Sequence, residues 1–168
     1  MTVVLVGTLD TKGLELRFVR DLLRDRGVET LIIDAGSLGP PIFPPDIDRE
    51  AIFANAGTSC EEIRAAGDRG NAVAAAARGV AVAVKKLHEE GLVDAILAIG
   101  GSAGTTIGTS AMRALPFGVP KVMVSTLASG QAVVLPPCSP GRHHYLAATP
   151  ELAATPAFGK NSCSPLIL

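Results

Sequence analysis

The 168-residue sequence has no tryptophan, one tyrosine and five phenylalanines. A surface that stacks nucleic-acid bases on aromatic rings is therefore not expected. Charged residues make up only 18% of the chain, and their formal sum is −1. Because bulk positive charge is what attracts a phosphate backbone, we expect no direct nucleic-acid binding.

Cysteine is also scarce: Cys60, Cys138 and Cys163 lie far apart and lack the spacing of a metal site. This odd number argues against a disulfide framework and suits a reducing compartment. No uncharged run reaches the roughly 18–20 residues of a membrane-spanning helix. The first residues enter an apolar run without the pattern of a signal peptide. We therefore expect a cytoplasmic protein with no membrane partner.

Short apolar runs dominate what is present, in a chain that is 48% hydrophobic. Residues 3–6, 30–33, 95–99 and 122–124 have the length and composition of buried strands. Residues 14–26 lie between the first two and show helical periodicity, so a parallel strand pair is expected. The pattern predicts a three-layer α/β fold of the Rossmann or flavodoxin-like type. Its sheet would be mostly parallel, with about four or five strands and helices on both faces.

The segment between the second strand and the longest helix is unusually long for an α/β unit. Four prolines between residues 37 and 45 preclude regular structure there. We expect a short helix from Asp48 to Asn55 and irregular chain from there to Gly67. This connection could be a lid, a subunit contact or a variable loop. Residues 70–90 are predicted to form the longest helix, rich in alanine and able to pack closely, including against a second subunit of a homodimer.

Glycines and hydroxyls concentrate in four turns, each at the carboxyl end of a predicted strand: residues 7–13, 34–39, 100–106 and 125–130. In parallel α/β sheets these ends share one edge, and ligands bind there where the strand order reverses. The turns at the opposite edge lack this clustering. The candidate ligand-binding residues are Gly7, Thr8, Asp10, Thr11, Lys12, Gly13, Asp34, Arg69, Gly100, Gly101, Ser102, Gly104, Thr105, Ser125, Thr126 and Ser129.

The residue types in these turns favour a phosphate-bearing ligand. Glycines let the backbone amides of residues 100–106 approach an anion, and the N-terminus of the following helix adds partial positive charge. Lys12 would meet phosphate charge, Asp10 could hold a divalent cation such as Mg²⁺, and Arg69 is a further phosphate contact. Asp34 lies where many nucleotide-binding folds hold a ribose hydroxyl. The alternatives are that Asp10 caps the following helix, that Asp34 caps a helix or turn through Ala35 and Gly36, and that Lys12 lies in solvent.

No strict nucleotide fingerprint accompanies these turns. The sequence lacks Gly-x-x-x-x-Gly-Lys-Ser/Thr, which argues against a P-loop NTPase. Gly-x-Gly-x-x-Gly is absent after the first strand, which weakens a standard NAD site. No Ser-His-Asp or Cys-His arrangement can be argued from residue order, so catalytic residues stay unassigned.

Several motifs occur together in one order: Gly-Thr-Leu-Asp-Thr-Lys-Gly at residues 7–13, Asp-Ala-Gly at 34–36, Gly-Asp-Arg-Gly at 67–70, Gly-Gly-Ser-Ala-Gly-Thr at 100–105 and Pro-Lys-Val-Met-Val-Ser-Thr-Leu-Ala-Ser-Gly at 120–130. This set resembles the Tm-1-like ATP-binding family, also catalogued as the uncharacterised UPF0261 family. The resemblance implies an N-terminal α/β domain that binds ATP, a tendency to dimerise and a second α/β domain after the first. Ala103 replaces a glycine that the family usually has.

The resemblance covers residues 1–130 and stops there. Residues 131–168 carry six prolines and no convincing periodicity, so no structure is predicted for them. We expect a family domain at 1–130 followed by a non-family tail, which a truncated or frame-shifted reading would explain. The leading function is a nucleotide-binding domain for ATP with Mg²⁺. The alternatives are an enzyme for a small phosphorylated or carboxylated metabolite and an inactive fragment without its second domain.

Overall fold

The computed structural model describes residues 1–126 in full and the backbone of residues 143–147. Within these residues no helix is both long and apolar enough to cross a membrane. The elements, in chain order, are β1 (Thr2–Gly7), α1 (Gly13–Arg24), β2 (Glu29–Asp34), α2 (Arg49–Asn55), α3 (Cys60–Ala66), α4 (Arg69–Glu89), β3 (Ala95–Gly100), α5 (Ser102–Ala114), β4 (Lys121–Ser125) and β5 (His143–Ala147).

The strands form one parallel sheet in the order β2-β1-β3-β4-β5. This confirms the predicted α/β fold, and the order is the flavodoxin-like one. The chain moves outward in one direction from β1 to β2 and in the other direction from β3 onward. The switch point therefore lies between β1 and β3, whose register pairs Val3 with Ala95. β5 was not expected, because it lies in the segment for which the sequence predicts no structure.

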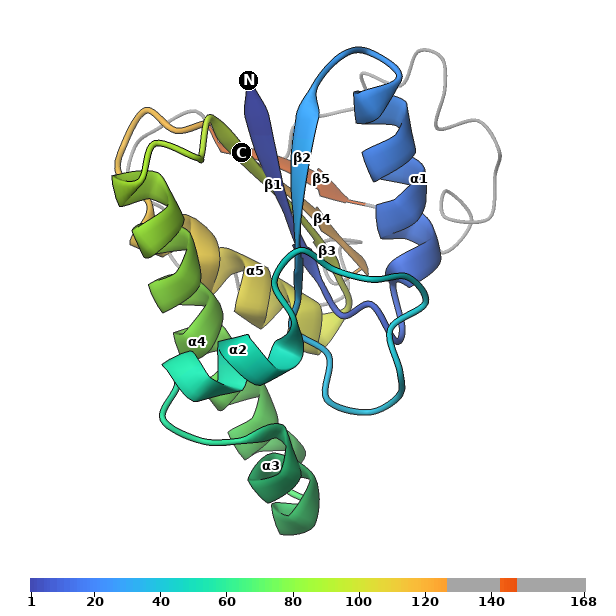
Figure 1. The fold of residues 1–168 in the computed structure, drawn as a ribbon, viewed down its shortest axis with the longest axis vertical. Coiled ribbons are helices and arrows are strands. Elements are labelled where there is room, and N and C mark those ends of the chain that lie inside the picture. Colours follow the sequence, from blue (N-terminus) through green and yellow to red (C-terminus); the bar gives the residue numbers. More distant parts are fainter. Residues whose placement is uncertain (127–142, 148–168) are drawn as a thin grey trace.

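Helices cover both faces of the sheet (Figure 1). α1 lies on one face, and α2, α4 and α5 lie on the other. The strand period of two divides β1 between two hydrophobic clusters. Val4 and Val6 belong to the larger cluster under α4 and α5, whereas Val3 and Leu5 belong to the smaller one under α1. All four side chains are buried, so the sheet separates two apolar layers of the core.

The close packing predicted for the alanine-rich helix is seen where α2 crosses α4. A Cβ built on Gly79 would collide with the backbone oxygen of Ile52. Only a residue without a side chain lets the two backbones approach this closely. On the neighbouring side, the Ser110 hydroxyl of α5 donates a hydrogen bond to the Ala77 carbonyl of α4 (3.1 Å). α4 is thus fixed between two helices by contacts at its backbone.

The expectation of irregular chain between Asn55 and Gly67 is wrong, because α3 occupies most of that segment. Ser59 and Glu62 form a capping box, in which each side chain accepts a hydrogen bond from the other's backbone amide. Gly67 ends the helix with a positive φ of 63°. Hydrogen bonds from the Thr58 hydroxyl and the Ser59 amide lower the pKa of Glu62. The contribution of this carboxylate to stability is present above its unfolded pKa and is lost as pH falls through its folded pKa.

We expect Gly79→Ala to destabilise the fold. Alanine is the better helix former by about 1 kcal/mol, but its Cβ would collide with the α2 backbone. Overpacking of this kind costs about 1–3 kcal/mol in the free energy of unfolding, which urea denaturation would measure. Arg78→Ala is the matched control: Arg78 is the exposed preceding residue, so a change within about 0.5 kcal/mol is expected. A more stable Gly79→Ala protein would contradict the close α2–α4 contact.

Candidate functional site

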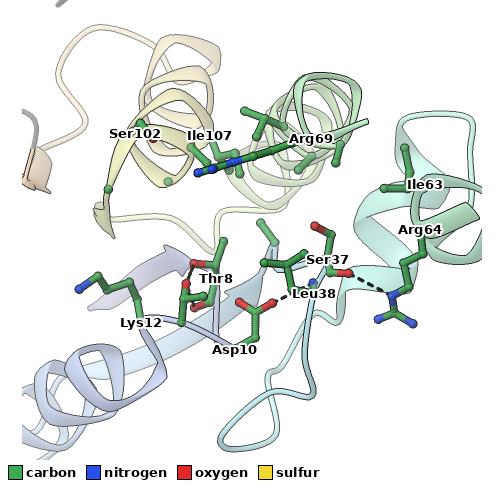
Figure 2. A pocket seen from close by; sticks show the side chains of 18 of the residues that line it. Thr8, Asp10, Lys12, Ser37, Leu38, Ile63, Arg64, Arg69, Ser102 and Ile107 are labelled. Atoms are coloured by element: carbon green, nitrogen blue, oxygen red, sulfur yellow. Dashed lines mark hydrogen bonds between the residues drawn. The ribbon is translucent and has the colours of Figure 1, made fainter. Parts of the chain in front are cut away.

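A cavity of about 580 Å³ lies at the switch point, beyond the carboxyl ends of β1 and β3 (Figure 2). The turns after β1, β2 and β3 form its walls together with α3, α4 and α5. The fold thus brings together segments that are far apart in the sequence. Eight of the candidate residues line this cavity: Thr8, Asp10, Thr11, Lys12, Arg69, Gly101, Ser102 and Gly104.

The turn after β1 presents two hydroxyls and an ammonium group beside the cavity. The hydroxyls of Thr8 and Thr11 are hydrogen-bonded to each other, and the Lys12 amide donates to the Thr8 carbonyl (2.7 Å). The Lys12 ammonium forms an ion pair with Glu15 (2.6 Å). Lys12 is also the N-cap residue of α1, and no side chain caps that helix. The first-turn amides of α1 therefore keep their donor capacity.

The turn after β3 also leads into a helix, α5, that no side chain caps. Gly101 is the N-cap residue of α5 and provides no side chain to cap it. A Cβ on Gly100 would lie 2.5 Å from the backbone of Gly104, so the turn is tightly closed. By contrast, α2, α3 and α4 are each capped by a side chain, from Asp48, Ser59 and Asp68 respectively. The two uncapped helices are the two that begin at the switch point.

Thr105 and Ser125 support this turn from below and do not line the cavity. Their hydroxyls are hydrogen-bonded to each other (2.6 Å), and the Thr105 hydroxyl also donates to the Gly101 carbonyl (2.7 Å). Both residues are buried.

Three of the candidate glycines, Gly7, Gly13 and Gly100, likewise serve the packing of the turns. A Cβ on Gly7 would lie less than 3 Å from Leu16, and a Cβ on Gly13 would lie less than 3 Å from Ile42. Thr126 lies near Gly101, and Ser129 lies outside the described residues.

Asp34 is buried beneath the cavity in an ion pair with Arg49 of α2. The Arg49 Nε and Nη2 atoms donate to one Asp34 carboxylate oxygen at 2.9 and 2.6 Å. The other oxygen accepts the amides of Leu9 and Gly36, each at 2.9 Å. Asp34 is fully buried and does not line the cavity. Its hydrogen bonds are those of the turn-capping alternative.

Asp10 takes a different position, because it lines the cavity and also holds the loop after β2. Its Oδ2 atom accepts the amides of Leu38 (3.0 Å) and Gly39 (3.2 Å) and lies 4.0 Å from the Arg49 guanidinium. Its Oδ1 atom is buried and has no hydrogen-bond partner in the described part of the chain. The buried group formed by Asp10, Asp34 and Arg49 therefore carries one more carboxylate than cation. A cation or a ligand hydroxyl would satisfy the unpartnered Oδ1 acceptor of Asp10.

Several residues at the cavity were not predicted, and α3 and α4 supply most of them. Ser37, Leu38, Ile63, Arg64, Ala72, Val73, Ala76 and Ile107 all line it. Arg64 donates from Nε to the Ser37 carbonyl (3.0 Å), which ties α3 to the loop after β2 (Figure 2). The Ser59-x-x-Glu62 capping box was the available signal for α3. The apolar residues carry no such signal, because a helix facing a cavity has the same pattern as one facing a core.

The fold and the cavity define a flavodoxin-like α/β domain with a ligand-sized cavity at its switch point. Comparison with known proteins gives the family. Residues 1–135 match the N-terminal domain of an uncharacterised protein family, UPF0261. The chain belongs to this family, which confirms the resemblance found in the sequence motifs.

Relatives in bacteria and plants share this region. A UPF0261 protein of Clostridium tetani is 44% identical over 128 residues, which are 76% of this chain and 32% of that protein. A UPF0261 protein of Brucella suis is 37% identical over 135 residues, 80% of this chain and 32% of that protein. The ToMV susceptible protein tm-1(GCR26) of Solanum lycopersicum is 31% identical over 143 residues, 75% of this chain and 19% of that protein. The chain thus matches about a third of the length of the bacterial relatives.

We expect Arg49→Met to unfold the region beneath the cavity. The variant would leave the buried Asp34 carboxylate without its cation, and breaking a buried pair in this way costs about 3–5 kcal/mol. Urea denaturation measures the loss. Arg113→Met removes an exposed arginine of α5 and is the control, with a change within about 0.5 kcal/mol. An equal, small effect of both variants would show that the Arg49–Asp34 pair does not hold the site.

Proposed function

We propose that this domain binds a nucleotide at the switch-point cavity, with ATP in complex with Mg²⁺ as the preferred ligand. One observation carries the proposal: the two helices that follow the switch-point strands β1 and β3 into this cavity, α1 and α5, lack a side-chain cap, whereas α4, which also begins at the cavity, is capped by Asp68. An uncapped helix N-terminus combines unpaired amides with the positive end of the helix dipole, and both favour phosphate. The glycines of the turn at residues 100–106 allow close approach of the phosphate to the backbone.

Two cationic side chains support the same assignment. Lys12 lies at the start of α1, and Arg69 extends across the cavity toward Ser102 and Ile107 (Figure 2). No hydrogen bond or ion pair fixes the Arg69 guanidinium within the described part of the chain. The hydroxyls of Thr8, Thr11 and Ser102 add neutral donors. This set suits an anion with several oxygen atoms better than it suits a single carboxylate.

Asp10 is the residue that would hold Mg²⁺. The described residues contain no cluster of three or more acidic, histidine or cysteine side chains, so an all-protein metal site is absent there. Mg²⁺ bound with nucleotide phosphates needs only one or two carboxylates, with water and phosphate oxygens completing its shell. The unpartnered Oδ1 atom of Asp10 meets that requirement. The bound ion would offset phosphate charge and the surplus negative charge of the Asp10–Arg49–Asp34 group.

We expect Lys12→Ala to weaken ATP binding about tenfold or more, because it removes a cation worth about 1.5–3 kcal/mol in a charge-assisted contact. Isothermal titration calorimetry with Mg-ATP measures the change. Lys86→Ala is the matched control, since Lys86 is an exposed lysine in the last turn of α4 and does not line the cavity. Absence of ATP binding in the unmodified chain, or equal affinity of both variants, would refute the proposal.

We also expect Asp10→Asn to abolish the effect of Mg²⁺ on ATP affinity while leaving metal-free binding of triphosphate in place. The asparagine keeps an oxygen for the Leu38 and Gly39 amides but removes the charge that attracts the cation. Calorimetry with ATP in Mg²⁺ and in EDTA gives the ratio of the two dissociation constants for each protein. That ratio should approach one in the variant. A ratio unchanged from that of the unmodified chain would exclude Asp10 as the metal ligand.

A further inference from the structure

The cavity has two chemically different ends. The polar end consists of Thr8, Thr11, Lys12 and Ser102 at the starts of α1 and α5. The opposite wall, which we call the apolar compartment, consists of Ile63, Ala72, Val73, Ala76 and Ile107. A volume of about 580 Å³ is in the range that holds a whole drug-sized molecule. A phosphate group alone would leave the apolar compartment empty.

The apolar compartment has few groups with which to read the edge of a base. None of the described residues that line the cavity is aromatic, histidine, asparagine or glutamine. Neighbouring backbone donors are already engaged: the amide of Ala35 donates to the Gly7 carbonyl (2.9 Å), and that of Gly36 donates to Asp34 (2.9 Å). The Leu38 amide donates to Asp10 (3.0 Å).

The remaining polar side chains near this wall distinguish adenine from guanine weakly. Arg69 extends toward Ser102 at the polar end, where the proposed function assigns it to the phosphate (Figure 2). Asp68 is engaged as the cap of α4, where it accepts the amides of Gly70 (2.8 Å) and Asn71 (3.1 Å). Arg64 donates to the Ser37 carbonyl. The Ser37 hydroxyl both donates and accepts hydrogen bonds, so it suits adenine and guanine equally.

We infer that the apolar compartment takes the nucleoside part of the ligand by shape and apolar contact, and that the site therefore accepts ATP and GTP with similar affinity. This inference rests on the proposed function. A site that hydrogen-bonds a polar edge rejects the wrong partner by a factor of about 10⁴ or more, whereas a hydrophobic pocket discriminates by about 10²-fold or less. The contacts that this compartment offers are those of a hydrophobic pocket. Ala72 and Ala76, one turn apart on α4, leave the room for the base.

The test uses the full 168-residue chain and titrates three probes by calorimetry in Mg²⁺: ATP, GTP and inorganic triphosphate. Ala72→Leu places a larger side chain in the apolar compartment. Ala74→Leu is the matched control, because Ala74 lies on the same helix but is exposed and does not line the cavity. Binding of triphosphate to each variant shows that the polar end is intact, which separates filling of the compartment from misfolding.

The expected result is that ATP and GTP bind the unmodified chain within about tenfold of each other. Ala72→Leu should weaken both about tenfold or more and leave triphosphate affinity unchanged, whereas Ala74→Leu should change none of the three. A preference for ATP above about 100-fold would overturn the inference, as would nucleotide affinities unaffected by Ala72→Leu. Binding of triphosphate with no gain from the nucleoside would overturn it while the phosphate site stands. Failure of all three probes would refute the proposed function itself.

Discussion

The buried carboxylate of Asp34 is the interaction on which the site depends. Its four hydrogen bonds reach the turn after β1 through Leu9, the turn after β2 through Gly36 and helix α2 through Arg49. Taking two charges out of water is costly, so the pair is stable only because nearly every donor and acceptor is matched. The Arg49 Nη1 atom completes the set by donating to the Gly39 carbonyl (2.6 Å). One ion pair thus fixes two cavity walls relative to the sheet.

This arrangement explains how a long connection rich in proline can form part of a defined cavity. The loop after β2 has no regular structure between Ala35 and Ile47, but side chains hold it from two directions. Asp10 accepts two of its amides, and Arg64 of α3 donates to the Ser37 carbonyl. The loop wall is therefore held by the protein's own hydrogen bonds, which would lower the entropic cost of binding a ligand there.

The sequence was sufficient to predict the fold class, the four strands of the family domain and the edge of the sheet at which the cavity lies. The reason is that apolar runs, glycine turns and helical periodicity are local features. Residues that act across the fold were harder to predict. The role of Arg49 depends on a partner 15 residues away that only the folded chain brings near. The apolar compartment could not be predicted, because Ala72 and Ala76 look like ordinary core positions until α3 and α5 are placed around them.

The parallel pairing of β1 with β3 has a consequence for folding. Val3 and Ala95 are neighbours in the sheet although 92 positions separate them in the chain, and the two polar turns of the cavity meet only when these strands pair. Such contacts close a long loop and form slowly compared with local helices. A ligand that needs both turns can bind only after β3 has been added to the sheet. Its binding free energy would therefore stabilise the completed sheet and no earlier folding intermediate.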